Sequence, residues 1–137
     1  MDYLLDTNAC IALINGVPLQ VRTRLQKATS TGARVLVSSI TTYELWYGVA
    51  KSSRREFNRQ RVETFLAGPI RLLPFEDMDA QTAGSVRSSL EVSGKPIGAY
   101  DVLIAGQALN NQLTLVTANV REFARVEGLE WQDWAKP

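Results

Sequence analysis

Short apolar segments that alternate with stretches of helical periodicity constrain the fold of this chain more than any other feature. The segments span residues 2–5, 34–38, 70–74 and 113–117, and residues 129–131 can add an edge strand. Strands that alternate with helices form right-handed β-α-β crossovers and a parallel sheet. Each segment is continuously apolar, as expected for strands that helices cover on both faces. The sequence therefore predicts an α/β/α sandwich with a four- or five-stranded parallel sheet.

The size and composition of the chain fit a single domain that spans residues 1–137. Hydrophobic residues make up 45% and charged residues 21% of the sequence, as in ordinary globular proteins. No apolar run approaches the ~20 residues of a membrane span. The N-terminus enters a strand almost at once and lacks the pattern of a signal peptide. We therefore expect a cytoplasmic protein with no membrane partner.

The sequence contains no histidine and one cysteine, Cys10, which excludes several kinds of chemistry. Ser-His-Asp and Cys-His sites need a histidine, and so does the acid–base pair of metal-free ribonucleases. A single cysteine excludes internal disulfides and cysteine-rich zinc sites, and Cys10 is interpreted as a small buried residue. Hydrolytic chemistry in this chain must therefore depend on carboxylates, together with a hard cation.

Acidic residues recur just after a predicted strand or a tight loop, at the starts of helices. Asp6 ends the first strand, Glu44 lies in the first turns of the helix after the second, and Asp101 lies in the first turn of a helix over 99–110. Asn119 follows the fourth strand, with Glu122 three residues later. These positions are candidates for one shared site.

Each position also has a purely structural interpretation. Asp6 can cap the helix that follows it, and Asp101 is favoured by the positive end of its helix dipole. The segments 41–44 and 119–122 have the spacing of a capping box. A site requires these residues to lie close together, whereas capping does not.

Parallel topology favours such a site, because strand carboxyl ends and following helix N-termini share the edge where ligands bind. Asp6, Glu44, Asp101 and Asn119 would line one depression there. Clustered carboxylates repel one another and need a cation to remain ionised together. Oxygen-only sites suit Mg²⁺ or Mn²⁺, which can organise phosphodiester hydrolysis by activating water and stabilising the leaving oxygen.

Four segments resemble, in order and at the family's spacing, the successive motifs of PIN-domain nucleases. They are residues 4–8 (LLDTN), 38–48 (SSITTYELWYG), 96–101 (PIGAYD) and 116–123 (VTANVREF). The tail from 125 to 134 is similar to the VapC toxins of bacterial VapBC toxin–antitoxin pairs. The resemblance covers essentially the whole chain and implies a metal-dependent endoribonuclease with a PIN-domain fold.

The resemblance also implies roles for individual residues. Asp6 and Asp101 would hold Mg²⁺ or Mn²⁺, Glu44 would complete the acidic cluster, and Asn119 would occupy the fourth catalytic position. Supporting residues would be Thr7, Asn8, Thr117 and Glu122. Asn119 is an amide, which weakens the case for a second metal site. Gln107 stands where close relatives often have histidine.

The same resemblance implies partners. The substrate would be a structured RNA, most plausibly a tRNA cut in the anticodon region, and a VapB-type antitoxin would cover the acidic site. The toxin would be a homodimer, forming a heterotetramer or larger assembly with antitoxin, which alone would contact operator DNA. Trp46 and Tyr47 would serve the dimer or antitoxin surface.

The segment 51–61 carries five basic residues and one acid, a net charge of +4. It is either a solvated helix or a surface that contacts RNA phosphates. The candidate RNA-binding residues are Arg54, Arg55, Arg59 and Arg61.

Two other functions are compatible with a strand that ends in Asp6. A haloacid-dehalogenase-like phosphatase needs a second aspartate two residues later, where this chain has Asn8. A catalytically silent PIN-fold binding module would have no need to keep three acids.

Overall fold

The computed structural model describes residues 1–136 and contains a five-stranded, fully parallel sheet. The strands are β1 (Tyr3–Leu5), β2 (Val35–Ser38), β3 (Arg71–Leu73), β4 (Thr114–Val116) and β5 (Trp131–Gln132). They lie in the order β3-β2-β1-β4-β5. The predicted parallel sheet is confirmed, and the edge strand begins two residues later than expected.

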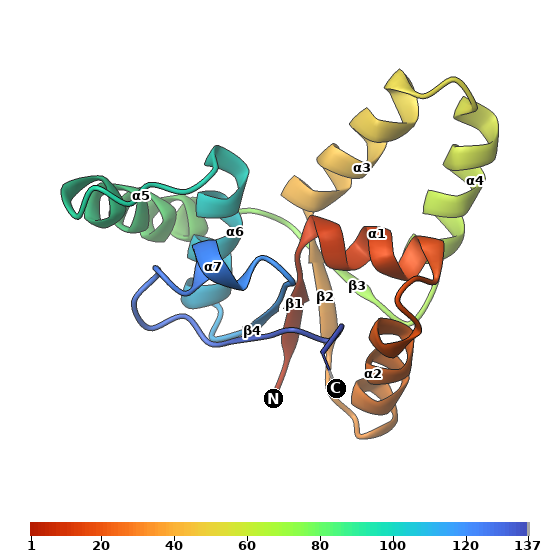
Figure 1. Ribbon diagram of the computed structural model, residues 1–137, viewed down its shortest axis with the longest axis horizontal. Coiled ribbons are helices and arrows are strands. Elements are labelled where there is room, and N and C mark those ends of the chain that lie inside the picture. Colours follow the sequence, from red (N-terminus) through yellow and green to blue (C-terminus); the bar gives the residue numbers. More distant parts are fainter. Residues whose placement is uncertain (137) are drawn as a thin grey trace.

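Helices cover both faces of the sheet, as predicted. They are α1 (Thr7–Asn15), α2 (Leu19–Ser30), α3 (Ser39–Lys51), α4 (Arg55–Leu66), α5 (Asp77–Val92), α6 (Ala99–Asn110) and α7 (Val120–Phe123). In Figure 1, α1 to α4 lie on one side of the strands and α5 to α7 on the other. None of the helices within residues 1–136 combines the length and the hydropathy that crossing a bilayer requires.

Alternating side chains of the central strand build the two halves of the core. Leu4 and Leu5 are fully buried on opposite faces. Leu4 packs in a cluster with residues of α5, α6 and α7, and Leu5 packs in a cluster with residues of α1 to α4. Leu36 and Val37 of β2 divide between the two clusters in the same way. The strands are continuously apolar because both faces are covered.

The helix starts decide which of the proposed caps exist. Asp6 is the N-cap of α1 and accepts a 2.7 Å hydrogen bond from the Ala9 N–H. The N-cap of α3 is Ser38, so the expected capping box at 41–44 does not exist. Asn119 precedes α7 but makes no side-chain capping bond, so the expected box at 119–122 is also wrong. The side chains of Glu44 and Asn119 are therefore available for other contacts.

Candidate active site

Asp6 lies at the carboxyl end of the central strand and is only 4% exposed. Burial raises the pKa of its carboxyl, and hydrogen bonds from the Thr117 hydroxyl and the Ala9 N–H oppose that rise. The nearby negative charges of Glu44 and Asp133 raise the pKa further. Asp6 therefore caps α1 and is also a buried carboxylate among other acids, so the cap does not exclude a role in a site.

Glu44 reaches the same edge from the second turn of α3. The Thr7 hydroxyl donates a 2.7 Å hydrogen bond to Glu44 Oε1 and lies 3.4 Å from the Thr41 hydroxyl oxygen. Thr7 belongs to the first turn of α1, so the bond joins α1 to α3 directly above the strand ends. This hydrogen bond fixes the position of one oxygen of the Glu44 carboxylate.

Asp101, in the first turn of α6, lies against Glu122 of α7. Burial, a hydrogen bond shared with Glu122 and the negative charges of Glu122, Asp6 and Glu44 raise the pKa of Asp101 to about 6. The Asn119 amide donates a 2.9 Å hydrogen bond to Glu122 Oε2. Of the two candidates for the fourth position, Glu122 is therefore the one that contacts Asp101, and Asn119 orients Glu122.

The remaining supporting residues differ in their contacts. The Thr117 hydroxyl, at the end of β4, bonds to Asp6 and accepts a 2.9 Å hydrogen bond from the Asn119 N–H. Asn8 is exposed on α1. Asp133 was missed by the sequence argument, although it follows the edge strand directly and its charge acts on Asp6. The signal that could have identified it was the one used for Asp6, an acid at the end of a strand.

These oxygen donors have the chemistry of a site for a hard cation. Glu44, Asp6 and Glu122 all raise the pKa of Asp101 by their charge, a repulsion that a bound cation would relieve. Within residues 1–136, however, no three His, Cys, Asp or Glu side chains are already arranged to hold an ion. Glu44 accepts the Thr7 hydrogen bond through Oε1, which leaves Oε2 for a cation, whereas Asp101 would give up the hydrogen bond that it shares with Glu122.

The basic segment is largely occupied by contacts within the protein. The Arg54 and Arg61 guanidinium groups lie 4.0 Å and 5.5 Å from the centre of the Phe57 ring. Arg61 also donates to the Asn15 side chain at 2.6 Å and to the Ile14 carbonyl at 3.2 Å, at the C-terminal end of α1. Arg61 therefore ties α4 to α1.

The other two arginines of the segment, Arg55 and Arg59, make fewer contacts within the protein. Arg59 forms a long, exposed ion pair of 3.6 Å with Glu56, and Arg55 is exposed at the first position of α4. Exposed pairs of this kind contribute little to stability. Arg55 and Arg59 are therefore the members of the segment best able to meet an external phosphate.

Gln107 is fully buried in α6 and has a structural contact. Its amide donates to the carbonyls of Leu73 and Pro74, at 3.3 Å and 3.2 Å, where β3 ends. Its side-chain oxygen has no hydrogen-bond partner in the part of the chain that the structure describes. The residue fastens α6 to the end of β3.

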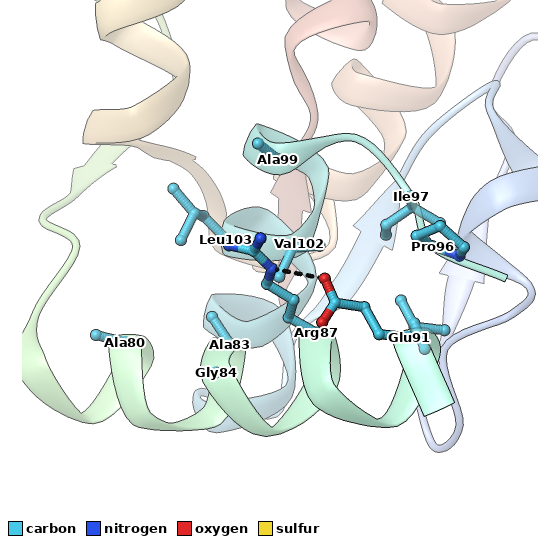
Figure 2. Close-up of a pocket in the computed structure, with 11 residues that line it drawn as sticks. Ala80, Ala83, Gly84, Arg87, Glu91, Pro96, Ile97, Ala99, Val102 and Leu103 are labelled. Atoms are coloured by element: carbon cyan, nitrogen blue, oxygen red, sulfur yellow. Dashed lines mark hydrogen bonds and ion pairs between the residues drawn. The ribbon is translucent and has the colours of Figure 1, made fainter. Parts of the chain in front are cut away.

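A cavity of about 440 Å³ lies between α5 and α6, apart from the acidic edge. Figure 2 shows that short apolar side chains line it, together with an Arg87–Glu91 pair at 3.1 Å. None of the candidate carboxylates of the edge lines this cavity. This cavity and the acidic edge are therefore separate features of the molecule.

Comparison with known proteins identifies the family of this chain. Residues 3–129 match the PIN domain family. The chain is 40% identical over 134 residues to the tRNA(fMet)-specific endonuclease VapC of Salmonella typhimurium, with 98% of each chain covered. It is 36% identical over 136 residues to ribonuclease VapC2 of Rickettsia felis, covering 99% of this chain and all of the relative.

Solved structures give the same result for the fold. The R. felis VapBC2 complex bound to a promoter DNA fragment matches with a TM-score of 0.91 and 35% identity, covering 98% of this chain and 99% of the other. The DNA-bound VapBC of S. typhimurium matches with a TM-score of 0.90 and 40% identity, covering 98% of each chain. This chain therefore belongs to the VapC family of PIN-domain ribonucleases.

Proposed function

We propose that this chain is the toxin of a VapBC-type pair and cleaves RNA at the acidic edge with the help of a divalent cation. The observation that carries the proposal is the convergence of Asp6, Glu44, Asp101 and Glu122 from separate segments. PIN-domain nucleases generally depend on divalent metals. The family match over residues 3–129 leaves the phosphatase alternative without support.

Asp6, Asp101 and Glu44 would hold Mg²⁺ or Mn²⁺, because hard cations prefer carboxylate oxygens. Such an ion, when bound, supplies an activated water and stabilises the leaving oxygen. Thr7 orients Glu44 through its 2.7 Å hydrogen bond, and Asn119 orients Glu122 through its 2.9 Å hydrogen bond. The Thr117 hydroxyl helps to keep Asp6 ionised. The catalytic set is therefore Asp6, Glu44 and Asp101, with Asn119 acting through Glu122.

The substrate would be a structured RNA, namely a tRNA cut in the anticodon region. Support comes from the relative named as a tRNA(fMet)-specific endonuclease, which is 40% identical to this chain. Exposed Arg55 and Arg59 could supply sequence-independent phosphate contacts. The alternative is a silent binding module on the same fold, which would bind RNA or protein without cleaving.

The partner would be a VapB-type antitoxin, as in the complexes that the chain resembles. A groove of about 170 Å³ between α1, α3 and α4 lies beside the site and could bind an apolar segment of the antitoxin. Its lining includes Ile11, Ile14, Leu45, Val49, Val62 and Glu44. An antitoxin arginine could then form a bidentate pair with a site carboxylate. We expect a toxin homodimer, assembled with antitoxin into a heterotetramer or larger complex that reaches operator DNA through the antitoxin.

The test of the enzyme is cleavage of total tRNA by the purified chain with Mg²⁺ or Mn²⁺, with sequencing of the new ends. We expect discrete cuts that EDTA abolishes and that D6N and D101N each eliminate, while circular dichroism shows both variants folded. Cleavage that persists in EDTA would contradict the metal role. Folded wild-type protein that binds tRNA without cutting it would favour the silent binding module.

The test of the partner uses expression in bacteria. Expression of the chain alone should stop growth. Co-expression of the antitoxin, the small protein that we expect a neighbouring gene to encode, should restore growth. Removing the antitoxin's C-terminal arginine should leave a complex that still forms through the apolar groove but cuts RNA again. A chain that is harmless at high expression with Asp6 intact would contradict the toxin assignment.

A further inference from the structure

Two tyrosines from separate helices meet beside the carboxylates, and the proposed chemistry leaves them unused. Tyr43 of α3 and Tyr100 of α6 are 57 residues apart, yet their ring centroids are 5.7 Å apart at an interplanar angle of 64°. The Tyr100 hydroxyl donates a 3.3 Å hydrogen bond to the Tyr43 hydroxyl. Tyr43 is 55% exposed and Tyr100 44% exposed. An exposed aromatic pair of this kind buries too little surface to be explained by the core.

The pair leaves about half of its surface open to solvent. In an edge-to-face arrangement, one ring presents its edge to one face of the other. The ring that contributes its edge keeps both faces free of its partner, and the other ring keeps one. The exposed fractions of Tyr43 and Tyr100 agree with this geometry. A flat ligand can therefore stack on the pair without separating the two rings.

The position of the pair ties it to the reacting phosphate. Tyr43 directly precedes Glu44, and Tyr100 directly precedes Asp101. The negative charge of Glu44 is among the causes that raise the pKa of Tyr100, after its hydrogen bond to Tyr43, so the pair lies close to the carboxylates. A phosphate bound at the carboxylates would therefore bring its neighbouring base close to the rings. Tyr47 lies one turn beyond Tyr43 on α3 and is 58% exposed.

The aromatic surface also ends in a positive charge. The Lys51 ammonium lies 5.0 Å from the centre of the Tyr47 ring, on the last residue of α3. A cation at this end can meet the next phosphate along an RNA strand. Aromatic rings, a carboxylate and a cation therefore occur together on α3, in the order Tyr43, Glu44, Tyr47 and Lys51.

We infer that Tyr43 and Tyr100 form a stacking platform for an unpaired RNA base next to the cleaved phosphodiester. The inference rests on the proposed ribonuclease function and adds a requirement for a base that is free to leave its helix. Stacking on tyrosine tolerates any base, because every base has a π-face. The platform therefore selects single-stranded loops by their conformation.

The test uses D6N protein, which should bind RNA without cutting it, and tRNA anticodon stem-loops with 2-aminopurine at one loop position at a time. One position should lose fluorescence on binding.

Y100L or Y43L should remove that quenching and weaken RNA binding roughly 5- to 100-fold, the loss expected for one base–aromatic stack. Y100F should stay within about twofold of the parent, because phenylalanine keeps the ring face. W131L, which removes an exposed aromatic side chain on β5, is the matched control and should have no effect.

An abasic residue at the quenched position separates stacking from other causes. It should weaken binding to the parent and not to Y100L. If it weakens binding to both equally, or if Y100L changes only oligomeric state or antitoxin affinity, the tyrosines form a protein interface and the inference is wrong. Wild-type protein that cuts RNA, with unaltered cleavage by Y43L and Y100L, overturns only the platform. Wild-type protein that neither binds nor cuts RNA overturns the ribonuclease function as well.

Discussion

The Thr7 hydroxyl donates a 2.7 Å hydrogen bond to Glu44 Oε1 and so joins the first turn of α1 to the second turn of α3. Partners that orient metal ligands typically affect metal affinity or activity by 10- to 100-fold when removed. We predict that T7V lowers kcat/KM by about that factor, whereas T7S, which keeps the hydroxyl, stays near wild type. Mg²⁺ titrations of cleavage rate measure both. Equal rates for T7V and wild type would show that Glu44 does not need this bond.

Asp6 combines a cap with a buried charge, and two substitutions separate these roles. D6N keeps an N-cap residue of similar quality, whereas D6A removes the cap at a cost of about 1 kcal/mol. Both should abolish cleavage, and only D6A should lose stability in urea unfolding with EDTA. D6N should be at least as stable as wild type, because it removes a buried carboxylate. Retained activity in D6N would assign Asp6 to capping alone.

The raised pKa of Asp101, about 6 against an ordinary value of 3.8, links stability to pH. Between these values the unfolded chain loses the proton and the folded chain keeps it, so the free energy of unfolding falls as pH rises. Metal-free protein should therefore be more stable near pH 4 to 5 than near pH 7, relative to D101N. Mg²⁺ should offset the loss at pH 7. Thermal unfolding across pH, with and without EDTA, measures the difference, and parallel curves for the two proteins would contradict it.

Gly106 and Gly84 are helical glycines in different surroundings, so substitution of each by alanine tests the packing of α6 on α5. A Cβ at Gly106 would lie 2.5 Å from the Ala83 Cα, where α6 meets α5, whereas a Cβ at Gly84 meets nothing within 4 Å. G106A should destabilise the protein by about 1–3 kcal/mol through overpacking. G84A should stabilise it by roughly 0.5–1 kcal/mol, the helix propensity difference. Urea unfolding measures both, and a neutral G106A would mean that the two helices separate at little cost.

Arg55 and Arg61 should respond differently, although they belong to one basic segment. R55Q should weaken RNA binding and reduce the log–log salt slope by roughly one unit, as for a lost phosphate contact. R61Q should leave the slope unchanged and lower stability by about 1 kcal/mol, because it breaks the bonds to Ile14 and Asn15. Filter binding at several salt concentrations and urea unfolding measure the two effects. A change of the salt slope in R61Q but not in R55Q would show that Arg61, and not Arg55, contacts the RNA phosphates.

The amino-acid sequence by itself determined the elements and the kind of chemistry. Local periodicity is encoded within a few residues, so the helix over 99–110 was predicted at the bounds that the structure has for α6. The absence of histidine limited the site to oxygen donors. The end of an apolar run identified Asp6 as a candidate, and the start of a helix identified Asp101.

The tertiary structure decided which side chains meet. Glu122 lies against Asp101, Thr7 bonds to Glu44 and Arg61 bonds to α1. Sequence spacing had suggested capping at 41–44 and 119–122, and an RNA contact for Arg61. These contacts depend on the strand order β3-β2-β1-β4-β5 and on helix crossings that bring distant segments together. Local periodicity does not predict these contacts. A helical pattern specifies which face of the helix is buried, but not which residues that face packs against.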